Sequence, residues 1–377
     1  MPVAEQRGGA ELALTHLMQE RTPSITWSVA FLEDGPMIDQ YRSMGVDVHL
    51  IESGQLREMG RFAWTVRRLA AIAREERIDA VMSWMGKPHL YGGLAARMAG
   101  VPALWYQHGL PKTRNMIDSM IAAVPARGIL ACSGTVADAQ REMGSTCPIE
   151  VAYPGVELNR CDEAQKTSPR ETRLALGLPV DGPLIGMVGR LQRWKGMHVL
   201  VEAMRTVLDR RPDAHCVIVG GEHSLEPDYP AMLNRRIDEV GLQGKVTLAG
   251  LKRNIPEWMQ AMDVFVHASD NEPFGMVIIE AMALGKPVIA GNAGGPTEIV
   301  TDGVDGLLCR YGDSAALASA ILRVLADPVL ALSLGAEAKR RAQDFSTVHY
   351  ARSVETAVAQ LVAQTEMWNR TANVTHA

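Results

Sequence analysis

Short apolar runs alternate with amphipathic segments along almost the whole chain. The runs have the length of a β-strand, and the segments between them repeat apolar residues at the spacing of an α-helix. Alternation of this kind predicts an α/β fold in which helices cover both faces of a doubly wound parallel sheet. In the first part of the chain we expect strands at 25–32, 46–51, 80–83, 103–106 and 129–131 and helices at 10–20, 61–76 and 91–99.

A polar, charged segment at residues 158–182 interrupts this alternation and leads into Pro183. Such a segment is typical of a crossover between domains. The alternation then restarts, with strands expected at 184–188, 215–219, 246–249, 264–267 and 287–290. We therefore expect two Rossmann-like domains, divided as follows: a first domain at 1–157, a linker at 158–182, a second domain at 183–345, and a helix at 346–377 that packs back onto the first domain.

Length and composition agree with two globular domains. The chain has 377 residues, of which 47% are hydrophobic and 21% are charged, as in soluble globular proteins. The net charge of −5 lacks the basic excess of a nucleic-acid-binding protein, so we expect no nucleic-acid partner. The five cysteines are scattered without a C-x-x-C pair, and the sequence has neither a bilayer-length apolar run nor a secretory signal. We therefore expect a cytoplasmic protein with no disulfide framework and no zinc site.

The first motif with chemical content lies at residues 189–196, between an expected strand and an expected helix. A glycine turn lets a ligand approach the backbone, and a helix start offers free N–H groups and the positive end of the helix dipole. Arg190 and Lys195 add two cations, five residues apart, which suit a diphosphate. The spacing is neither that of a P-loop nor G-x-G-x-x-G, so on its own the motif fits a loop with solvated cations better.

A stronger motif occupies residues 271–283, where a loop leads into an apolar helix. The first N–H groups of that helix, from Phe274 to Val277, face the loop, where a phosphate would bind. Glu280 lies further along the helix among apolar neighbours, so an ordinary surface role fits it poorly. Because a carboxylate beside phosphates needs a neutral partner, we expect Glu280 and Glu272 to bind ribose or sugar hydroxyls.

Further candidate residues follow other strands or precede helices. Gly294 and Gly295 form a turn before a helix, and Gly8 and Gly9 do the same near the amino terminus. His108 lies two residues after the strand expected at 103–106, which makes a catalytic role about as well supported as a structural one. Ligands of open α/β sheets bind at the carboxyl ends of strands, so these positions are candidate ligand contacts. The sequence has no Asp-x-Asp motif that would hold a diphosphate through a metal ion.

Together these motifs resemble those of a family 4 retaining glycosyltransferase (glycosyltransferase group 1) of the GT-B fold. The resemblance rests on G-R-L-x-x-x-K-G at 189–196, E-P-F-G-x-x-x-x-E-A-M-A at 272–283 and G-G-x-x-E at 294–298. It implies two Rossmann-like domains that face each other across a cleft. It also implies transfer of a hexosyl group from a nucleoside-diphosphate sugar, with a UDP-sugar as the favoured donor. The implied acceptor is a hydroxyl group of a glycan, of a lipid-linked molecule or of a small molecule.

The resemblance also assigns roles to single residues. Arg190 and Lys195 would hold the donor diphosphate and stabilise the leaving nucleotide. Glu272 would contact the donor sugar, and His108 would lie near the reacting sugar. The implied donor-binding positions, many of them acting through the backbone, are Gly9, Gly189, Leu251, Arg253, Phe274, Gly275, Met276, Val277 and Glu280. Because cations and a helix amino terminus stabilise the leaving charge in such a scheme, we expect neither a divalent metal nor another cofactor.

The amino terminus departs from the family pattern, which begins with a buried apolar strand before the glycine loop. Here only seven residues precede Gly8, and among them Val3 is the one β-branched residue. We therefore expect the first strand of the first domain to be missing or truncated. The alternatives are that another segment takes its place or that the true start lies upstream of Met1.

Two other functions compete with sugar transfer. A sugar-nucleotide epimerase of the same fold would bind the same donor, but it needs acids and bases around the hexose, where we identify only His108 and Glu272. A non-catalytic sugar-nucleotide-binding module would need no such acids or bases. Release of nucleoside diphosphate, with and without an acceptor, distinguishes the three.

A weak peripheral membrane contact is the alternative to a solvated surface on the helix expected at 61–76. Arginines surround Phe62 and Trp64 there, an arrangement that suits anionic lipids; they are Arg57, Arg61, Arg67, Arg68, Arg74 and Arg77. Acidic residues dilute the charge, namely Glu58, Glu75 and Glu76. We therefore favour an ordinary solvated helix face over contact with the inner face of the membrane.

Overall fold

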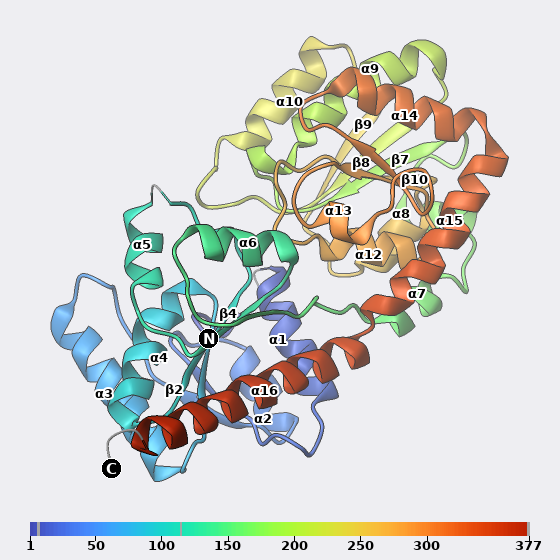
Figure 1. Ribbon diagram of the computed structural model, residues 1–377. Helices are drawn as coiled ribbons and strands as arrows, with labels where there is room; N and C mark the ends of the chain where they lie inside the picture. Colours follow the sequence, from blue (N-terminus) through green and yellow to red (C-terminus); the bar gives the residue numbers. More distant parts are fainter. Residues whose placement is uncertain (6–7, 114, 375–377) are drawn as a thin grey trace. The chain divides into compact units, whose positions relative to one another are not determined.

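The computed structural model describes residues 1–5, 8–113 and 115–374, with side chains described as far as Gln364. The chain divides into two compact units (Figure 1). The first comprises Met1–Gly155 and Thr347–Ala377, and the second comprises Val156–Ser346. All strand pairs in the described part of the chain are parallel. The predicted α/β class with parallel sheets is confirmed.

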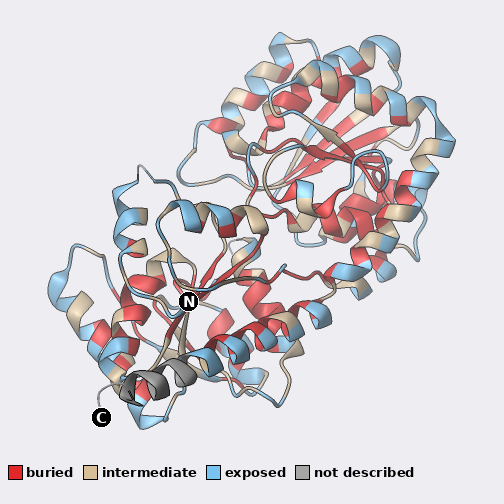
Figure 2. Ribbon diagram, in the orientation of Figure 1, coloured by how far each residue is buried: buried red, intermediate tan, exposed pale blue. Residues whose placement is uncertain are grey.

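The first unit contains two parallel sheets, one of order β1-β2 and one of order β3-β4-β5-β6. Its strands are β1 (Ser28–Phe31), β2 (Asp47–Leu50), β3 (Val81–Trp84), β4 (Ala103–Gln107), β5 (Gly128–Ala131) and β6 (Ile149–Val151). Its first helices are α1 (Gly9–Glu20), α2 (Met37–Ser43), α3 (Met59–Glu75), α4 (Gly86–Ala99), α5 (Met116–Ala122) and α6 (Gly134–Glu142). Every residue of β4 and β5 is buried (Figure 2), as expected for parallel strands covered on both faces.

The segment Met1–Ala4 lies against β1 and occupies the place where we expected a missing strand. The Met1 amino group donates a hydrogen bond to the Ala30 carbonyl at 2.9 Å, and the Leu32 N–H donates to the Met1 carbonyl at 3.1 Å. Val3 and Ala4 are buried. A strand signal was weak here because so short a segment has little pattern, yet its apolar side chains and two backbone hydrogen bonds fix it beside β1.

The carboxyl-terminal helix α16 (Thr347–Val374) belongs to the first unit. Leu361 packs so closely on Gly128 of β5 that a Cβ atom at that glycine would lie 2.6 Å from the leucine side chain. Glu355 accepts hydrogen bonds from the N–H and the hydroxyl of Thr22, at 2.9 and 2.6 Å. These contacts fix the helix to the amino-terminal part of the chain. Residues 375–377 of the expected helix lie outside the described residues.

The second unit is built on one parallel sheet of order β12-β11-β10-β7-β8-β9. Its strands are β7 (Leu184–Val188), β8 (His215–Val219), β9 (Val246–Gly250), β10 (Val264–His267), β11 (Val288–Gly291) and β12 (Leu307–Cys309). Its later helices are α9 (Met197–Arg210), α10 (Tyr229–Glu239), α11 (Ile255–Gln260), α12 (Met276–Ala283), α13 (Pro296–Ile299), α14 (Ser314–Ala326) and α15 (Pro328–Ala342). This is the strand order of a Rossmann fold, and the order reverses between β7 and β10.

Residues 158–182, which we expected to form a linker, instead contain α7 (Leu158–Ala164) and α8 (Pro169–Leu176) of the second unit. The α8 helix begins with a complete capping box between Ser168 and Glu171, which stabilises a helix in this polar sequence. Arg173 of α8 is buried and pairs with Asp263 at 2.6 Å. The polar composition that we interpreted as a linker is therefore that of two helices with ion-paired side chains, the second of which is capped.

Apolar residues of the β-strands and of the surrounding helices form the core of the second unit. Leu317 and Ile321 of α14 and Leu334 of α15 are buried in it.

Among the described residues, no single helix is long and apolar enough to cross a membrane. The helix Ser314–Ala326 and the segment Pro328–Phe345 meet the length and composition criteria only as a pair, which is bent by 102°.

Candidate active site

The candidate site lies in the second unit, at the carboxyl ends of β7 and β10. The loop after β7 carries Arg190 and Lys195, and the loop after β10 carries Glu272. These two strands are neighbours in the sheet, so the topology brings the first and second sequence motifs together. The strand order of the sheet reverses between β7 and β10, and open α/β sheets bind ligands at such a switch point.

A buried ion pair forms the centre of this site. Lys195 Nζ lies 2.5 Å from Glu272 Oε2, and the two side chains are 14% and 10% exposed. Burial of Glu272 favours its neutral form, but the charge of Lys195 and a hydrogen bond with His267 outweigh burial and hold the pKa of Glu272 well below its usual range. The site therefore presents one carboxylate, which accepts hydrogen bonds, next to one ammonium group, which donates them.

His267, the last residue of β10, faces the same carboxylate. Its Nε2 lies 3.2 Å from Glu272 Oε2 and 3.2 Å from the Ser269 hydroxyl, and the residue is 1% exposed. We did not predict this residue from the sequence. The signal was present, because His267 ends an apolar strand run and so lies near the carboxyl end of a strand, as does His108, which we did select.

Two loops are locked together behind the ion pair. The Asp270 N–H donates to the Trp194 carbonyl at 2.7 Å, and the ring of Trp194 packs 4.1 Å from Lys195 Nζ. Gly196 has φ +80°, and a Cβ atom there would lie 2.0 Å from the Ala268 carbonyl oxygen. The glycine that ends the first motif is therefore required by the close approach of the loop after β10.

The glycine turn at Gly294 and Gly295 supports the loop that carries Glu272. Gly294 pairs with Glu272 in a parallel bridge, and the Gly295 N–H donates to the Glu272 carbonyl at 2.8 Å. A Cβ atom at Gly294 would lie 2.3 Å from that carbonyl, and one at Gly295 would lie 2.3 Å from Phe274 Cα. These two glycines allow the backbone after β11 to lie directly against the backbone that carries Glu272.

The helix α12 begins beside this loop. Gly275 precedes its first residue with φ +114° and ψ +53°, a conformation that favours glycine. The first N–H groups of a helix have no acceptor within the helix, so Gly275, Met276 and Val277 present the donor-rich end that we predicted. Phe274 is buried and Glu280 is half-buried. Their predicted roles in donor binding stay predictions.

The two arginines of the first motif have different surroundings. Arg193 forms ion pairs with Glu226 at 3.1 Å and Asp228 at 2.5 Å, and its guanidinium lies 5.4 Å from the ring centre of Tyr229. Arg190 is exposed, and its side chain has no ion pair with any described residue. Arg193 therefore joins two loops, whereas Arg190 is available to a ligand.

The remaining donor-binding candidates of the second unit lie further along the sheet edge. Gly189 follows β7 and is approached by Gly220, where a Cβ atom would lie 1.8 Å from the Gly189 carbonyl oxygen. Leu251, just after β9, is 77% exposed, and Arg253 is also exposed. All three follow the carboxyl ends of strands, as we expected, and their contacts with a donor stay predictions.

Two predicted site residues, His108 and Gly9, belong to the first unit. His108 directly follows β4 and packs on Tyr106 and Trp84, with ring centres 4.1 and 4.9 Å apart. Burial lowers the pKa of His108 to about 3, so its ring is neutral at pH 7. Gly9 is exposed at the start of α1. Their predicted roles near the donor stay predictions.

The arginines of α3 and its flanks are partly engaged within the first unit. Arg61 Nε donates to the Glu52 carbonyl at 2.6 Å, Arg68 pairs with Glu75 at 3.6 Å, and Arg74 donates to the Met98 carbonyl. The choice between a solvated helix face and a membrane contact stays a prediction.

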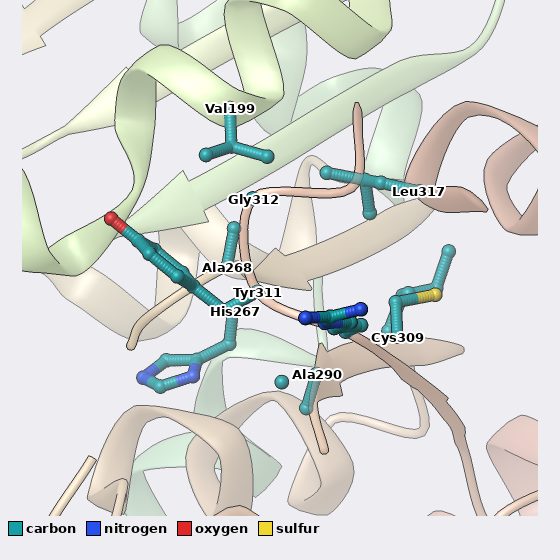
Figure 3. Close-up of a pocket in the computed structure, with 11 residues that line it drawn as sticks. Val199, His267, Ala268, Ala290, Cys309, Tyr311, Gly312 and Leu317 are labelled. Atoms are coloured by element: carbon teal, nitrogen blue, oxygen red, sulfur yellow. The ribbon is translucent and has the colours of Figure 1, made fainter. Parts of the chain in front are cut away.

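A small cavity lies beside the site, between the carboxyl ends of β10, β11 and β12. Its volume is about 10 Å³, and His267, Tyr311, Cys309 and Leu317 line it. Figure 3 shows His267 and Tyr311 on one side of this cavity and Cys309 and Leu317 on the other.

A Rossmann-type unit with a lysine–glutamate pair at its switch point, in a chain of two α/β units, fits the class of GT-B glycosyltransferases. Comparison with known families agrees with this class. A model described as "Glycosyl transferases group 1" matches residues 169–341, and one described as "Glycosyltransferase Family 4" matches residues 8–160. The chain belongs to glycosyltransferase family 4.

The chain is also similar to individual proteins. A protein of Corynebacterium urealyticum named D-inositol 3-phosphate glycosyltransferase is 30% identical over 327 residues, which are 85% of this chain and 73% of that protein. The crystal structure of Anabaena Alr3699/HepE in complex with UDP and glucose superposes with a TM-score of 0.84 at 26% identity and covers 96% of this chain and 98% of that one. Sucrose-phosphate synthase from Thermosynechococcus elongatus superposes with a TM-score of 0.78 at 25% identity, over 97% and 96% of the two chains.

Proposed function

We propose that this glycosyltransferase moves a hexosyl group from a UDP-sugar to an acceptor hydroxyl, with retention of the anomeric configuration and without a divalent metal. The observation that carries the proposal is the Lys195–Glu272 pair at the switch point of the sheet. A lysine suits the phosphates of a donor, and a carboxylate suits the hydroxyl groups of its sugar. The choice of UDP is supported by the Anabaena structure, which was determined with UDP and glucose.

The chemistry needs stabilisation of a leaving diphosphate. As the bond between the anomeric carbon and the diphosphate oxygen breaks, negative charge develops on that oxygen. Lys195, Arg190 and the first N–H groups of α12 are fixed donors that stabilise this charge. Because these groups supply positive charge themselves, the proposal includes no metal ion.

Retention follows if the acceptor hydroxyl attacks the face from which the diphosphate leaves. A bond forms between the acceptor oxygen and the anomeric carbon, and the leaving diphosphate takes the proton of the acceptor hydroxyl. The enzyme then supplies no separate base. His108, which is neutral at pH 7, would act near the donor sugar as a hydrogen-bonding group rather than as a cation.

A thermal-shift panel tests the donor. UDP, GDP and ADP, and their glucose or mannose derivatives, would be compared with and without EDTA. Because a ligand stabilises the state that binds it, we expect UDP and one UDP-sugar to raise the melting temperature equally in both conditions. Loss of every shift in EDTA would contradict metal independence, and the absence of any shift would contradict the proposed donor site.

The acceptor is tested next, with release of UDP as the measurement. Acceptor candidates begin with D-inositol 3-phosphate, which the name of the C. urealyticum relative suggests, and include free glucose and lipid-linked sugars. We expect one of them to accelerate release of UDP, and the anomeric coupling constant of the product to match that of the donor. Epimerisation of the donor without an acceptor would favour the epimerase instead, and binding without turnover would favour a non-catalytic module.

A further inference from the structure

His267 contacts the central ion pair, although we did not predict this residue from the sequence. Its Nε2 is 3.2 Å from the Glu272 carboxylate, and the ring is buried at the end of β10. The other described partner of the same oxygen atom is Lys195, at 2.5 Å. One carboxylate oxygen therefore has two nitrogen neighbours, one flexible and one held rigidly in the sheet.

In the proposed function, Lys195 leaves the Glu272 carboxylate when a donor binds, whereas His267 stays beside it. Lys195 Nζ must turn toward the diphosphate when a donor binds, since its ammonium cannot be centred on both groups equally. Glu272 then keeps its charge in a place where its side chain is 10% exposed. A buried carboxylate that loses its partner is strongly disfavoured unless another hydrogen bond remains. Among the described contacts of this carboxylate, the bond to His267 is the one that remains.

We propose that His267 is a positioning residue whose Nε2–H holds the Glu272 carboxylate in place after Lys195 has turned to the donor diphosphate. The inference rests on the proposed function, because it assumes that Lys195 binds phosphate and that Glu272 binds the donor sugar. It assigns to His267 no contact with the substrate.

The hydrogen-bonding pattern of the ring follows from this assignment. If Nε2 carries the proton and donates to Glu272, then Nδ1 of the neutral ring is an acceptor. Nδ1 is buried and has no hydrogen-bond partner among the described residues. The adjoining cavity of about 10 Å³ has the size of a site for one water molecule, which can donate to Nδ1 and fix this tautomer. Figure 3 shows the ring at one side of that cavity.

The test uses His267→Leu and His267→Gln in the full chain, with His215→Leu as a control at the opposite end of the sheet. Leucine removes the donor, and glutamine restores an N–H group of similar reach. Titration calorimetry would measure the affinities for UDP and for UDP-glucose, and a coupled assay would measure turnover. Melting temperatures establish that each variant is folded.

We expect the affinity of His267→Leu for UDP to stay within about twofold of that of the wild type, because UDP lacks the sugar that Glu272 is proposed to bind. The affinity for UDP-glucose relative to that for UDP should fall by about 10- to 100-fold, and kcat should fall by a similar factor. His267→Gln should recover most of that loss, and His215→Leu should behave as the wild type. In ¹⁵N spectra, the wild-type His267 should carry its proton on Nε2.

Two results would overturn the inference, and a third would overturn the proposed function. Unchanged glucose-dependent affinity and kcat in His267→Leu would show that Glu272 needs no second support. Equal losses in the leucine and glutamine variants, at equal melting temperature, would show that the N–H group is not what matters. A wild type that binds neither UDP nor UDP-glucose would instead overturn the proposed function on which the inference rests.

Discussion

Lys195 and Glu272 form a 2.5 Å ion pair between two loops that are 77 residues apart in the sequence. Each residue balances a charge that would otherwise be buried alone. Removing one partner of a buried pair commonly costs about 3–5 kcal/mol, whereas replacing both by apolar groups costs much less. The pair therefore links the stability of the second unit to the same groups that we propose bind the donor.

Replacement of either partner should abolish transfer. We expect Lys195→Met to lower the stability of the second unit by about 3 kcal/mol, because Glu272 loses its strongest partner. The double variant Lys195→Met with Glu272→Leu should regain most of that stability while remaining inactive. Urea unfolding gives the stabilities, and UDP release gives the activities. A double variant as unstable as Lys195→Met would show that the pair does not couple the two residues.

Arg190 and Arg193 provide a matched pair of substitutions three residues apart. Arg193 is occupied by Glu226 and Asp228, and its side chain is 47% exposed. Arg193→Ala should therefore cost at most about 1 kcal/mol of stability and leave kcat within a few-fold of the wild type. Arg190→Ala should leave stability unchanged and lower kcat/KM by about 10- to 100-fold, since it removes a cation aimed at the leaving diphosphate. The reverse pattern of activities would move the diphosphate contact to Arg193.

Much of the second unit could be predicted from the sequence because parallel strands buried on both faces are continuous apolar runs. Five of its strands were expected within about one residue of the observed bounds. The short strand β12 and the helices α7, α8 and α15 were missed. In α8, polar composition outweighed the capping box at Ser168, which is the local signal that starts the helix. In α7, no side-chain cap marks the start of the helix.

The site could be predicted only in part, because motif spacing identifies residues but not their partners. The motif singles out Arg190 and leaves Arg193 at a variable position, and only the fold shows that Glu226 and Asp228 engage Arg193. The pairing of Lys195 with Glu272 depends on which strands are neighbours, which local pattern does not encode. In the first unit, Met1–Ala4 was too short to show a period, although backbone hydrogen bonds hold it beside β1.

Gly196 tests whether backbone contact between the two loops matters. Its φ is +80°, and a Cβ atom at this position would lie only 2.0 Å from the Ala268 carbonyl oxygen, so any side chain there is strained. Gly196→Ala should cost more than about 2 kcal/mol and lower kcat. Gly241→Ala is the control, because Gly241 has φ +72° in open space and should cost only about 1 kcal/mol, with unchanged kcat. Equal costs would mean that the positive φ, and not the contact with Ala268, determines the effect.

His89 should make the first unit sensitive to acid. The residue is fully buried in α4, stacks on Trp105 with ring centres 4.8 Å apart, and lies 3.1 Å from the Val124 carbonyl. Burial lowers the pKa of His89 from 6.5 to about 4, although the hydrogen bond to Val124 opposes this shift. A depressed folded-state pKa means that the unfolded chain binds the proton first. The titration of His89 therefore leaves the free energy of unfolding unchanged above pH 6.5 and lowers it as the pH falls toward 4.

The loss should approach about 3 kcal/mol at pH 4, because each pKa unit corresponds to about 1.36 kcal/mol. His89→Gln, which keeps an N–H donor but does not titrate, should be less stable than the wild type at pH 7 and should lose less stability between pH 6.5 and 4. Urea unfolding at several pH values measures both proteins. Parallel pH profiles for the wild type and His89→Gln would show that another group causes the acid sensitivity of this unit.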